Sequence, residues 1–247
     1  MGRGIYGECR ICGTYSRLTY EHVPPRCAFN DEPIKSYKLG EWWKLQAGES
    51  ARHTNEQRGA GDHLLCDRCN NHVCGTWYVP ELCKWVRAVA PVWEAVPDGA
   101  DETFVANIGL RRVRPALFAK QVVAMLLAST PPGFANEHPE LQRVVLKRDA
   151  RGLPERYQLY LILFKRDVAR ETGVYSAFNA FGARAFQAVE LSYPPFSYLL
   201  TIGEGSVAER LGAIGRFLDD GPDDERELKL QLAVNWTLLP EDIATPT

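Results

Sequence analysis

The chain has 247 residues, of which 45% are hydrophobic and 24% are charged, and its formal net charge at pH 7 is −2. This composition excludes a disordered chain and is sufficient for a buried core in one or two domains. The small net charge gives no general attraction to nucleic acid, so such binding would depend on local patches. Without a signal peptide or a run long enough to span a bilayer, we expect a cytoplasmic protein in a reducing compartment.

The first predicted elements are a metal-binding turn and a strand. Cys9 and Cys12 are separated by two residues and flanked by glycines, which is the spacing of a zinc knuckle. Residues 17–23 (RLTYEHV) alternate in the manner of a strand, and Pro24-Pro25 ends it. The strand carries the acid-histidine pair Glu21-His22.

Residues 31–62 lose this periodicity and contain several glycines and basic residues. We therefore expect a long loop, and loops held on a rigid frame often carry function. Trp42-Trp43 lies within this stretch and is interpreted as a packing anchor rather than as a base-stacking platform.

A second Cys-x-x-Cys pair, Cys66/Cys69, follows the loop and runs directly into Asn70. Four thiolates from two such pairs complete a tetrahedral zinc shell, so we predict structural Zn²⁺ on Cys9, Cys12, Cys66 and Cys69. The three remaining cysteines, Cys27, Cys74 and Cys83, fall outside this spacing, and we interpret them as small, buried, reduced side chains.

The rest of the chain indicates an α+β protein with a mostly antiparallel sheet and helices on one face. Apolar residues recur at helical spacing over 80–96, with a break near Gly75 or Pro80, and strong helix formers fill 116–128. The Pro97-Asp98-Gly99 turn predicts a boundary between an N-terminal domain, 1–97, and a C-terminal domain, 98–247. Further strands are predicted at 157–164, 174–178, 186–191, 198–202 and 228–236, with a helix at 207–218.

The candidate chemistry lies with Glu21, His22 and Asn70. Hydrolysis of a phosphodiester needs a base to take a proton from water and a divalent cation to neutralise charge on the phosphate. A neutral imidazole can be that base, and carboxylate and amide oxygens suit a hard cation. Because successive side chains of a strand point to opposite faces, Glu21 could reach the metal while His22 reaches the water.

The first third of the chain resembles the HNH endonucleases of the ββα-metal class, in particular their four-cysteine zinc members, the endonuclease VII-like nucleases of phages. The resemblance rests on the segments CRICG, LTYEHVPP and LCDRCNN, which begin at Cys9, Leu18 and Leu65. It implies an N-terminal treble-clef nuclease unit with structural zinc on the four cysteines. It also implies His22 as general base, with Glu21 and Asn70 as ligands of a catalytic Mg²⁺ or Mn²⁺.

The family commonly has an asparagine that orients the catalytic imidazole shortly before the second cysteine pair. Gly61 occupies that place here, and Asn55 is the nearest asparagine upstream. The resemblance implies a metal-dependent endonuclease acting on DNA, with a prokaryotic or phage role in DNA processing. The C-terminal domain would bind substrate, a partner or a second copy of the chain, and a homodimer would supply the two active sites that double-strand cleavage commonly uses.

Two other classes of function stay open at this point. A non-catalytic zinc-stabilised module could bind nucleic acid or protein with the same residues, and a thiol protein could sense oxidants through its cysteines. Loss of plasmid nicking in a His22→Ala variant would favour the enzyme. Equal inactivity of both proteins would favour the module, and a zinc-free protein that stays folded would favour the sensor.

Overall fold

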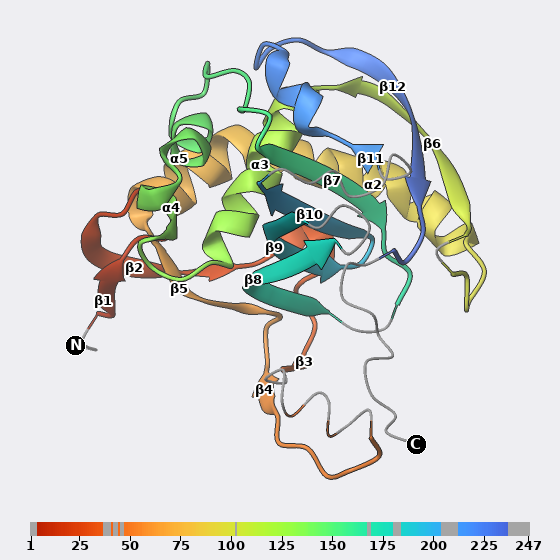
Figure 1. Cartoon of the computed structure of the whole chain (residues 1–247), viewed down its shortest axis with the longest axis horizontal. Helices are drawn as coiled ribbons and strands as arrows, with labels where there is room; N and C mark the ends of the chain where they lie inside the picture. The colour runs from red at the N-terminus through yellow and green to blue at the C-terminus, as the bar shows by residue number, and fades with distance from the viewer. Residues whose placement is uncertain are drawn as a thin grey trace.

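The computed structural model describes residues 4–36, 41, 44, 47–101, 103–166, 169–179, 184–203 and 212–236. Within these residues the fold mixes helices with antiparallel sheets, which confirms the predicted α+β class at this level (Figure 1). No helix among them is long and apolar enough to cross a membrane.

The N-terminal part is built from three strands and a long helical segment. Strands β1 (Tyr6–Glu8), β2 (Tyr15–His22) and β5 (Gly61–Cys66) form an antiparallel sheet in the order β1-β2-β5. The π-helix η2 (Arg68–Tyr78) follows β5 and continues directly into α2 (Val79–Ala95). The predicted strand and helix are thus confirmed. The predicted break at Gly75 or Pro80 is wrong, because the chain stays helical through both residues and only changes from π-helix to α-helix between Tyr78 and Val79.

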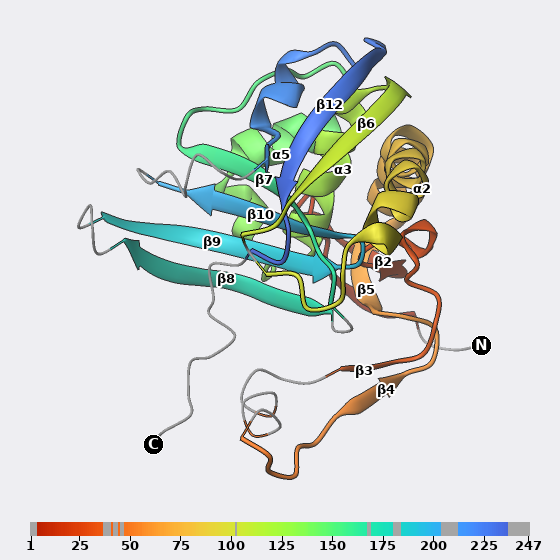
Figure 2. The ribbon, with the colours of Figure 1, turned by 90° about the vertical axis from the view of Figure 1, so that its right-hand side faces the viewer.

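The segment between β2 and β5 projects from the body of the molecule as an arm (Figures 1 and 2). It contains the short 3-10 helix η1 (Arg26–Ala28) and the antiparallel strands β3 (Ile34–Ser36) and β4 (Thr54–Glu56). The predicted loop is therefore partly a two-stranded ribbon. Trp42-Trp43 lies outside the described residues.

The C-terminal part centres on an antiparallel sheet with the strand order β11-β7-β10-β9-β8. Its strands are β7 (Tyr157–Leu163), β8 (Arg170–Asn179), β9 (Arg184–Tyr193), β10 (Phe196–Ile202) and β11 (Gly212–Ala213). The predicted strand near the C-terminus is β12 (Arg226–Ala233), which pairs with β6 (Val105–Val113) in a separate ribbon. The mostly antiparallel sheet is confirmed.

The helix predicted at 207–218 is wrong where the chain is described. Gly212–Ala213 pair with β7 as β11, and residues 215–219 form the 3-10 helix η3 (Gly215–Asp219). A Cβ at Gly212 would collide with the side chain of Leu232 and lie 2.9 Å from the Leu161 carbonyl oxygen. Close packing of β11 against its neighbours therefore requires glycine, which is itself a poor helix former.

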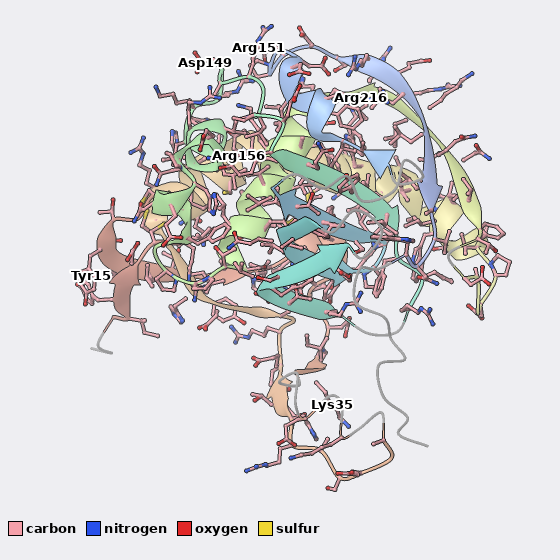
Figure 3. All side chains as sticks on the ribbon, viewed as in Figure 1. Tyr15, Lys35, Asp149, Arg151, Arg156 and Arg216 are labelled. Atoms are coloured by element: carbon pink, nitrogen blue, oxygen red, sulfur yellow. A yellow bond between two sulfur atoms is a disulfide. The ribbon has the colours of Figure 1, made fainter. Side chains whose placement is uncertain are left out.

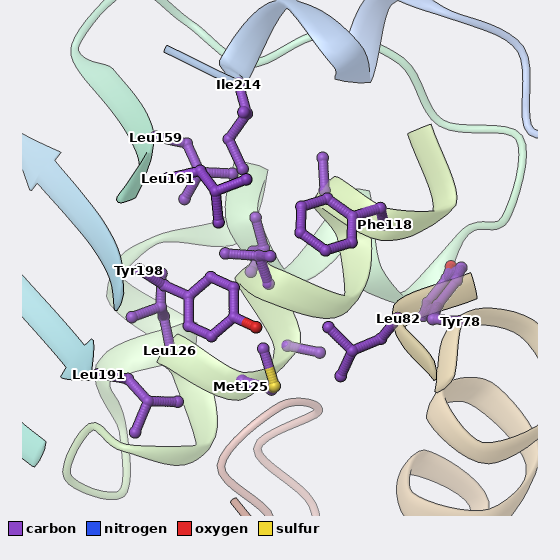
Figure 4. Packing of buried hydrophobic residues seen from close by; sticks show 14 of the residues in the cluster. Tyr78, Leu82, Phe118, Met125, Leu126, Leu159, Leu161, Leu191, Tyr198 and Ile214 are labelled. Carbon is purple, nitrogen blue, oxygen red and sulfur yellow. The ribbon is translucent and has the colours of Figure 1, made fainter. Parts of the chain in front are cut away.

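Helix α3 (Pro115–Ala128), predicted correctly, lies at the centre of the molecule, with every residue buried. It packs against β9 and β10 on one side and against η2 and α2 on the other (Figure 4). Helix α5 (Pro139–Leu146) also packs against it, and α4 (Phe134–Glu137) packs against α5 (Figure 1). The Trp85 ring of α2 stacks on Phe118 of α3, with the ring centroids 3.8 Å apart. One hydrophobic core includes both Cys9 and Val234, so it extends on both sides of the domain boundary predicted at residue 97.

Two of the three cysteines that lie outside the Cys-x-x-Cys pairs depart from prediction. Cys27 of η1 and Cys83 of α2 form a disulfide, with their Cα atoms 5.4 Å apart, whereas Cys74 is a free, buried thiol as expected. The prediction failed for Cys27 and Cys83 because they are separated by 56 positions in sequence, and only the packing of η1 on α2 brings them together. The disulfide ties the root of the arm to the helix.

Candidate metal centre and active site

The first cysteine pair lies in the turn that joins β1 and β2. The turn is closed by hydrogen bonds from the Gly13 N–H to the Cys9 carbonyl (2.9 Å) and from the Cys9 N–H to the Thr14 carbonyl (3.0 Å). Gly13 has a φ of 70°, in the left-handed region, and the side chain of Asn136 fills the space that a Cβ would need. Glycine is therefore required for this turn to carry both sulfurs on one side.

The second pair lies where β5 passes into η2. Cys66 is the last residue of β5, and Cys69 lies in the first turn of the helix. The two pairs are held together by a hydrogen bond from the Arg10 N–H to the Leu64 carbonyl (3.1 Å). Gln142 of α5 also donates a hydrogen bond to the Ile11 carbonyl (3.1 Å), so the body of the protein fixes the turn from outside.

The four sulfurs, of Cys9, Cys12, Cys66 and Cys69, all lie within 4.8 Å of one another and could hold a metal ion such as zinc. Cys9 and Cys69 are buried, and the sulfurs of Cys12 and Cys66 are 3.8 Å apart. A hydrogen bond from the Cys69 thiol lowers the pKa of Cys9 to about 4, and the same interaction raises the pKa of Cys69. Four thiols this close cannot all ionise without a cation, and an all-sulfur donor set suits Zn²⁺.

Glu21 lies on the buried side of β2, near enough to Cys74 of η2 for the two groups to interact electrostatically. Its side chain is 9% exposed, and no described residue forms a hydrogen bond or an ion pair with its carboxyl group. Burial alone raises the pKa of Glu21 from 4.5 to about 8. An unpartnered carboxyl group in a buried position is costly as an anion, and a bound cation would compensate for that cost.

Asn70 approaches the same part of β2 from the first turn of η2. Its amide nitrogen donates hydrogen bonds to the Thr19 hydroxyl (2.9 Å) and to the Tyr20 carbonyl (3.1 Å), directly before Glu21. These two bonds fix the amide group, and the neighbouring Cys69 anchors its backbone. The structure thus places Asn70 against β2 at the residue before Glu21.

His22 ends β2 and lies on the other side of the strand from Glu21. Its Nε2 is 2.9 Å from the Arg58 carbonyl oxygen, which can only accept, so Nε2 carries the proton and Nδ1 keeps its lone pair. Partial burial lowers the pKa of His22, and the charges of Arg26 and Arg58 lower it too. Together they outweigh the hydrogen bond to the Arg58 carbonyl and the charge of Asp31, which raise it. The imidazole is therefore neutral at pH 7 and has a basic nitrogen.

A buried asparagine that the sequence analysis missed holds the Arg58 carbonyl in place. Asn30 is 0% exposed, and its amide nitrogen donates to the carbonyls of Pro24 (2.6 Å) and Ala60 (2.8 Å). Its Oδ1 accepts the Ala60 N–H at 2.6 Å. Asn30 therefore clamps the chain just after His22 to the chain just after Arg58, at the root of the arm.

The group that orients the imidazole is thus not the one suggested by sequence. Asn55 is exposed on β4, where it pairs with Lys35, and the imidazole instead donates to the Arg58 backbone. A backbone carbonyl leaves no signature in a sequence. Gly59, with a φ of 88° and Asn30 where its Cβ would be, was the available hint of a tight turn at this point.

Comparison with models of protein families found no match, and searches of curated proteins and of solved structures likewise found none.

Proposed function

We propose that this protein is a metal-dependent endonuclease that hydrolyses phosphodiester bonds in DNA. The observation that carries the proposal is the hydrogen bond from His22 Nε2 to the Arg58 carbonyl, which leaves Nδ1 as a neutral base. His22 directly follows Glu21, whose buried carboxyl group has no partner among the described residues. Phosphodiester hydrolysis requires a base and a hard-metal ligand, and consecutive residues of β2 offer one of each, on opposite sides of the strand.

In this proposal each group of residues has one role. The four cysteines would hold structural Zn²⁺, which would join the β1–β2 turn to η2, and Glu21 and Asn70 would hold Mg²⁺ or Mn²⁺. When bound, the divalent ion would neutralise charge on the scissile phosphate and on the leaving oxygen. Nδ1 of His22 accepts a proton from water as the water oxygen attacks phosphorus, the phosphorus–oxygen ester bond breaks, and the leaving oxygen takes a proton from solvent.

The experiment is nicking of supercoiled plasmid by purified, zinc-loaded protein with Mg²⁺ or Mn²⁺. We expect the wild-type protein to nick the plasmid and His22→Ala to leave it intact while keeping its zinc and its fold. If both proteins are inactive in both metals, the endonuclease proposal is refuted, and a non-catalytic zinc-stabilised binding module is what remains.

A further inference from the structure

An exposed aromatic ring lies directly beside the proposed base. Tyr20 is two residues before His22 on β2, and its side chain is 40% exposed. The centroids of its ring and of the His22 ring are 5.1 Å apart, and those of its ring and the His63 ring are 5.6 Å apart. Both imidazoles meet the tyrosine at steep interplanar angles, 74° and 83°.

The position of this ring depends on a glycine in the neighbouring strand. Tyr20 pairs with His63 and His22 pairs with Gly61 across the β2–β5 ladder. A Cβ at Gly61 would lie 2.9 Å from Cε1 of Tyr20 and would collide with the Glu21 carbonyl oxygen. The ring thus lies over Gly61 between two imidazoles, and its orientation is fixed before any ligand arrives.

Charged residues surround the ring unevenly. Arg26 and Arg58 are exposed and close enough to His22 to lower its pKa, so cationic groups border the base. Arg58 also lies near Tyr20, together with the carboxylates of Glu56 and Asp62. The phosphates of a nucleic-acid strand would contact the arginines, and a neighbouring base would then lie beside the tyrosine ring.

We propose that Tyr20 is a stacking platform for an unpaired nucleobase of the substrate, with Arg26 and Arg58 contacting the adjacent phosphates. This inference rests on the proposed function and narrows its substrate class. Bases in a regular duplex are already stacked and paired, whereas bases in single strands, loops and branches offer a free face to an aromatic ring. The substrate is therefore a nucleic acid with unpaired nucleotides at the cleavage point.

Another exposed tyrosine, to which we assign no role, provides a matched control for Tyr20. Tyr15 begins the same strand, far from His22 and at the outer edge of the β1–β2 hairpin, and is 74% exposed (Figure 3). Tyr15→Ala removes a ring of the same size from the same sheet, and Tyr20→Phe keeps the ring at the proposed platform while removing the hydroxyl.

The test measures binding in the His22→Ala background, so that cleavage does not interfere. Fluorescence anisotropy with labelled single-stranded DNA, single-stranded RNA and duplex DNA gives the Kd of each variant at fixed salt. We expect Tyr20→Ala to raise the Kd for both single strands roughly 5- to 150-fold, the range of one base–aromatic stack. Tyr20→Phe, Tyr15→Ala and all duplex measurements should match the His22→Ala parent.

The arginines give a second readout. Replacing Arg26 and Arg58 together with alanine should reduce the slope of log Kd against log salt by roughly 1.4 on single strands, which corresponds to two lost phosphate contacts. If Tyr20→Ala binds single strands as tightly as Tyr15→Ala does, the inference fails while the endonuclease proposal stands. If the parent binds no nucleic acid at all, both fail.

Discussion

Replacement of Glu21 by glutamine tests the divalent-metal ligand most sharply. Glutamine has nearly the same shape as glutamate but cannot ionise and is a weak ligand for Mg²⁺. In the wild-type protein, burial raises the pKa of Glu21 from 4.5 to about 8, and no described residue compensates for its charge. The variant removes the charge without opening a cavity.

The sign of the pH effect follows from the raised pKa. Stability from the neutral carboxyl group is fully present below pH 4.5 and is lost as the pH rises toward 8, because the folded state resists releasing this proton. A tenfold change in a proton-binding constant corresponds to about 1.36 kcal/mol, so between pH 4.5 and 7 the metal-free wild-type protein loses roughly 3 kcal/mol that Glu21→Gln retains. Binding of Mg²⁺ should reverse this loss and release a proton.

The assay is urea unfolding of zinc-loaded protein from about pH 5 to pH 8, with and without Mg²⁺. Glu94→Gln on the exposed side of α2 is the matched control. We expect Mg²⁺ to stabilise the wild type and Glu94→Gln increasingly as the pH rises and to leave Glu21→Gln unchanged. Equal pH slopes in all three proteins, or equal stabilisation by Mg²⁺, would refute the assignment of Glu21 as a metal ligand.

Two further predictions concern the frame around the site. Cys66→Ser should lose zinc and unfold the N-terminal part, since structural zinc contributes roughly 10–16 kcal/mol in small finger peptides. The control Cys74→Ser should keep its zinc. Elemental analysis measures the zinc and circular dichroism the fold, and a zinc-replete, folded Cys66→Ser would contradict the prediction. Asn30→Ala should destabilise the protein by about 2–5 kcal/mol and slow cleavage, because it leaves the Pro24 carbonyl and the Ala60 N–H without their partner. Asn55→Ala should change neither unfolding nor cleavage, and equal effects of the two alanines would contradict the clamp.

The elements that could be predicted from sequence are those with a local signal. The apolar period of α2, the helix formers of α3, the alternation in β2 and the strand-like run of β10 all depend on residues close together in the chain. The cysteine spacing likewise indicated four sulfurs around one point, because two tight turns each aim a pair of side chains at a common centre.

The features that could not be predicted depend on contacts between distant segments. Strand β6 was missed, and the pairing of β12 with it rather than with the large sheet is set by tertiary packing. The Cys27–Cys83 disulfide exists only because η1 packs on α2. Asn30 carries no motif, and its role becomes visible only when Pro24 and Ala60 are seen on either side of its amide.

The central claim is that zinc bound by the four cysteines fixes the fold of the site, so that Glu21, as a metal ligand, and His22, as a base, can hydrolyse a phosphodiester. The plasmid assay tests this claim most directly. Wild-type protein, His22→Ala and the matched His72→Ala, which replaces an exposed histidine of η2, are compared at equal zinc content with Mg²⁺ or Mn²⁺. The account predicts nicking by the wild type and His72→Ala and none by His22→Ala. Undiminished nicking by His22→Ala, or no nicking by the zinc-loaded wild type in either metal, would contradict it.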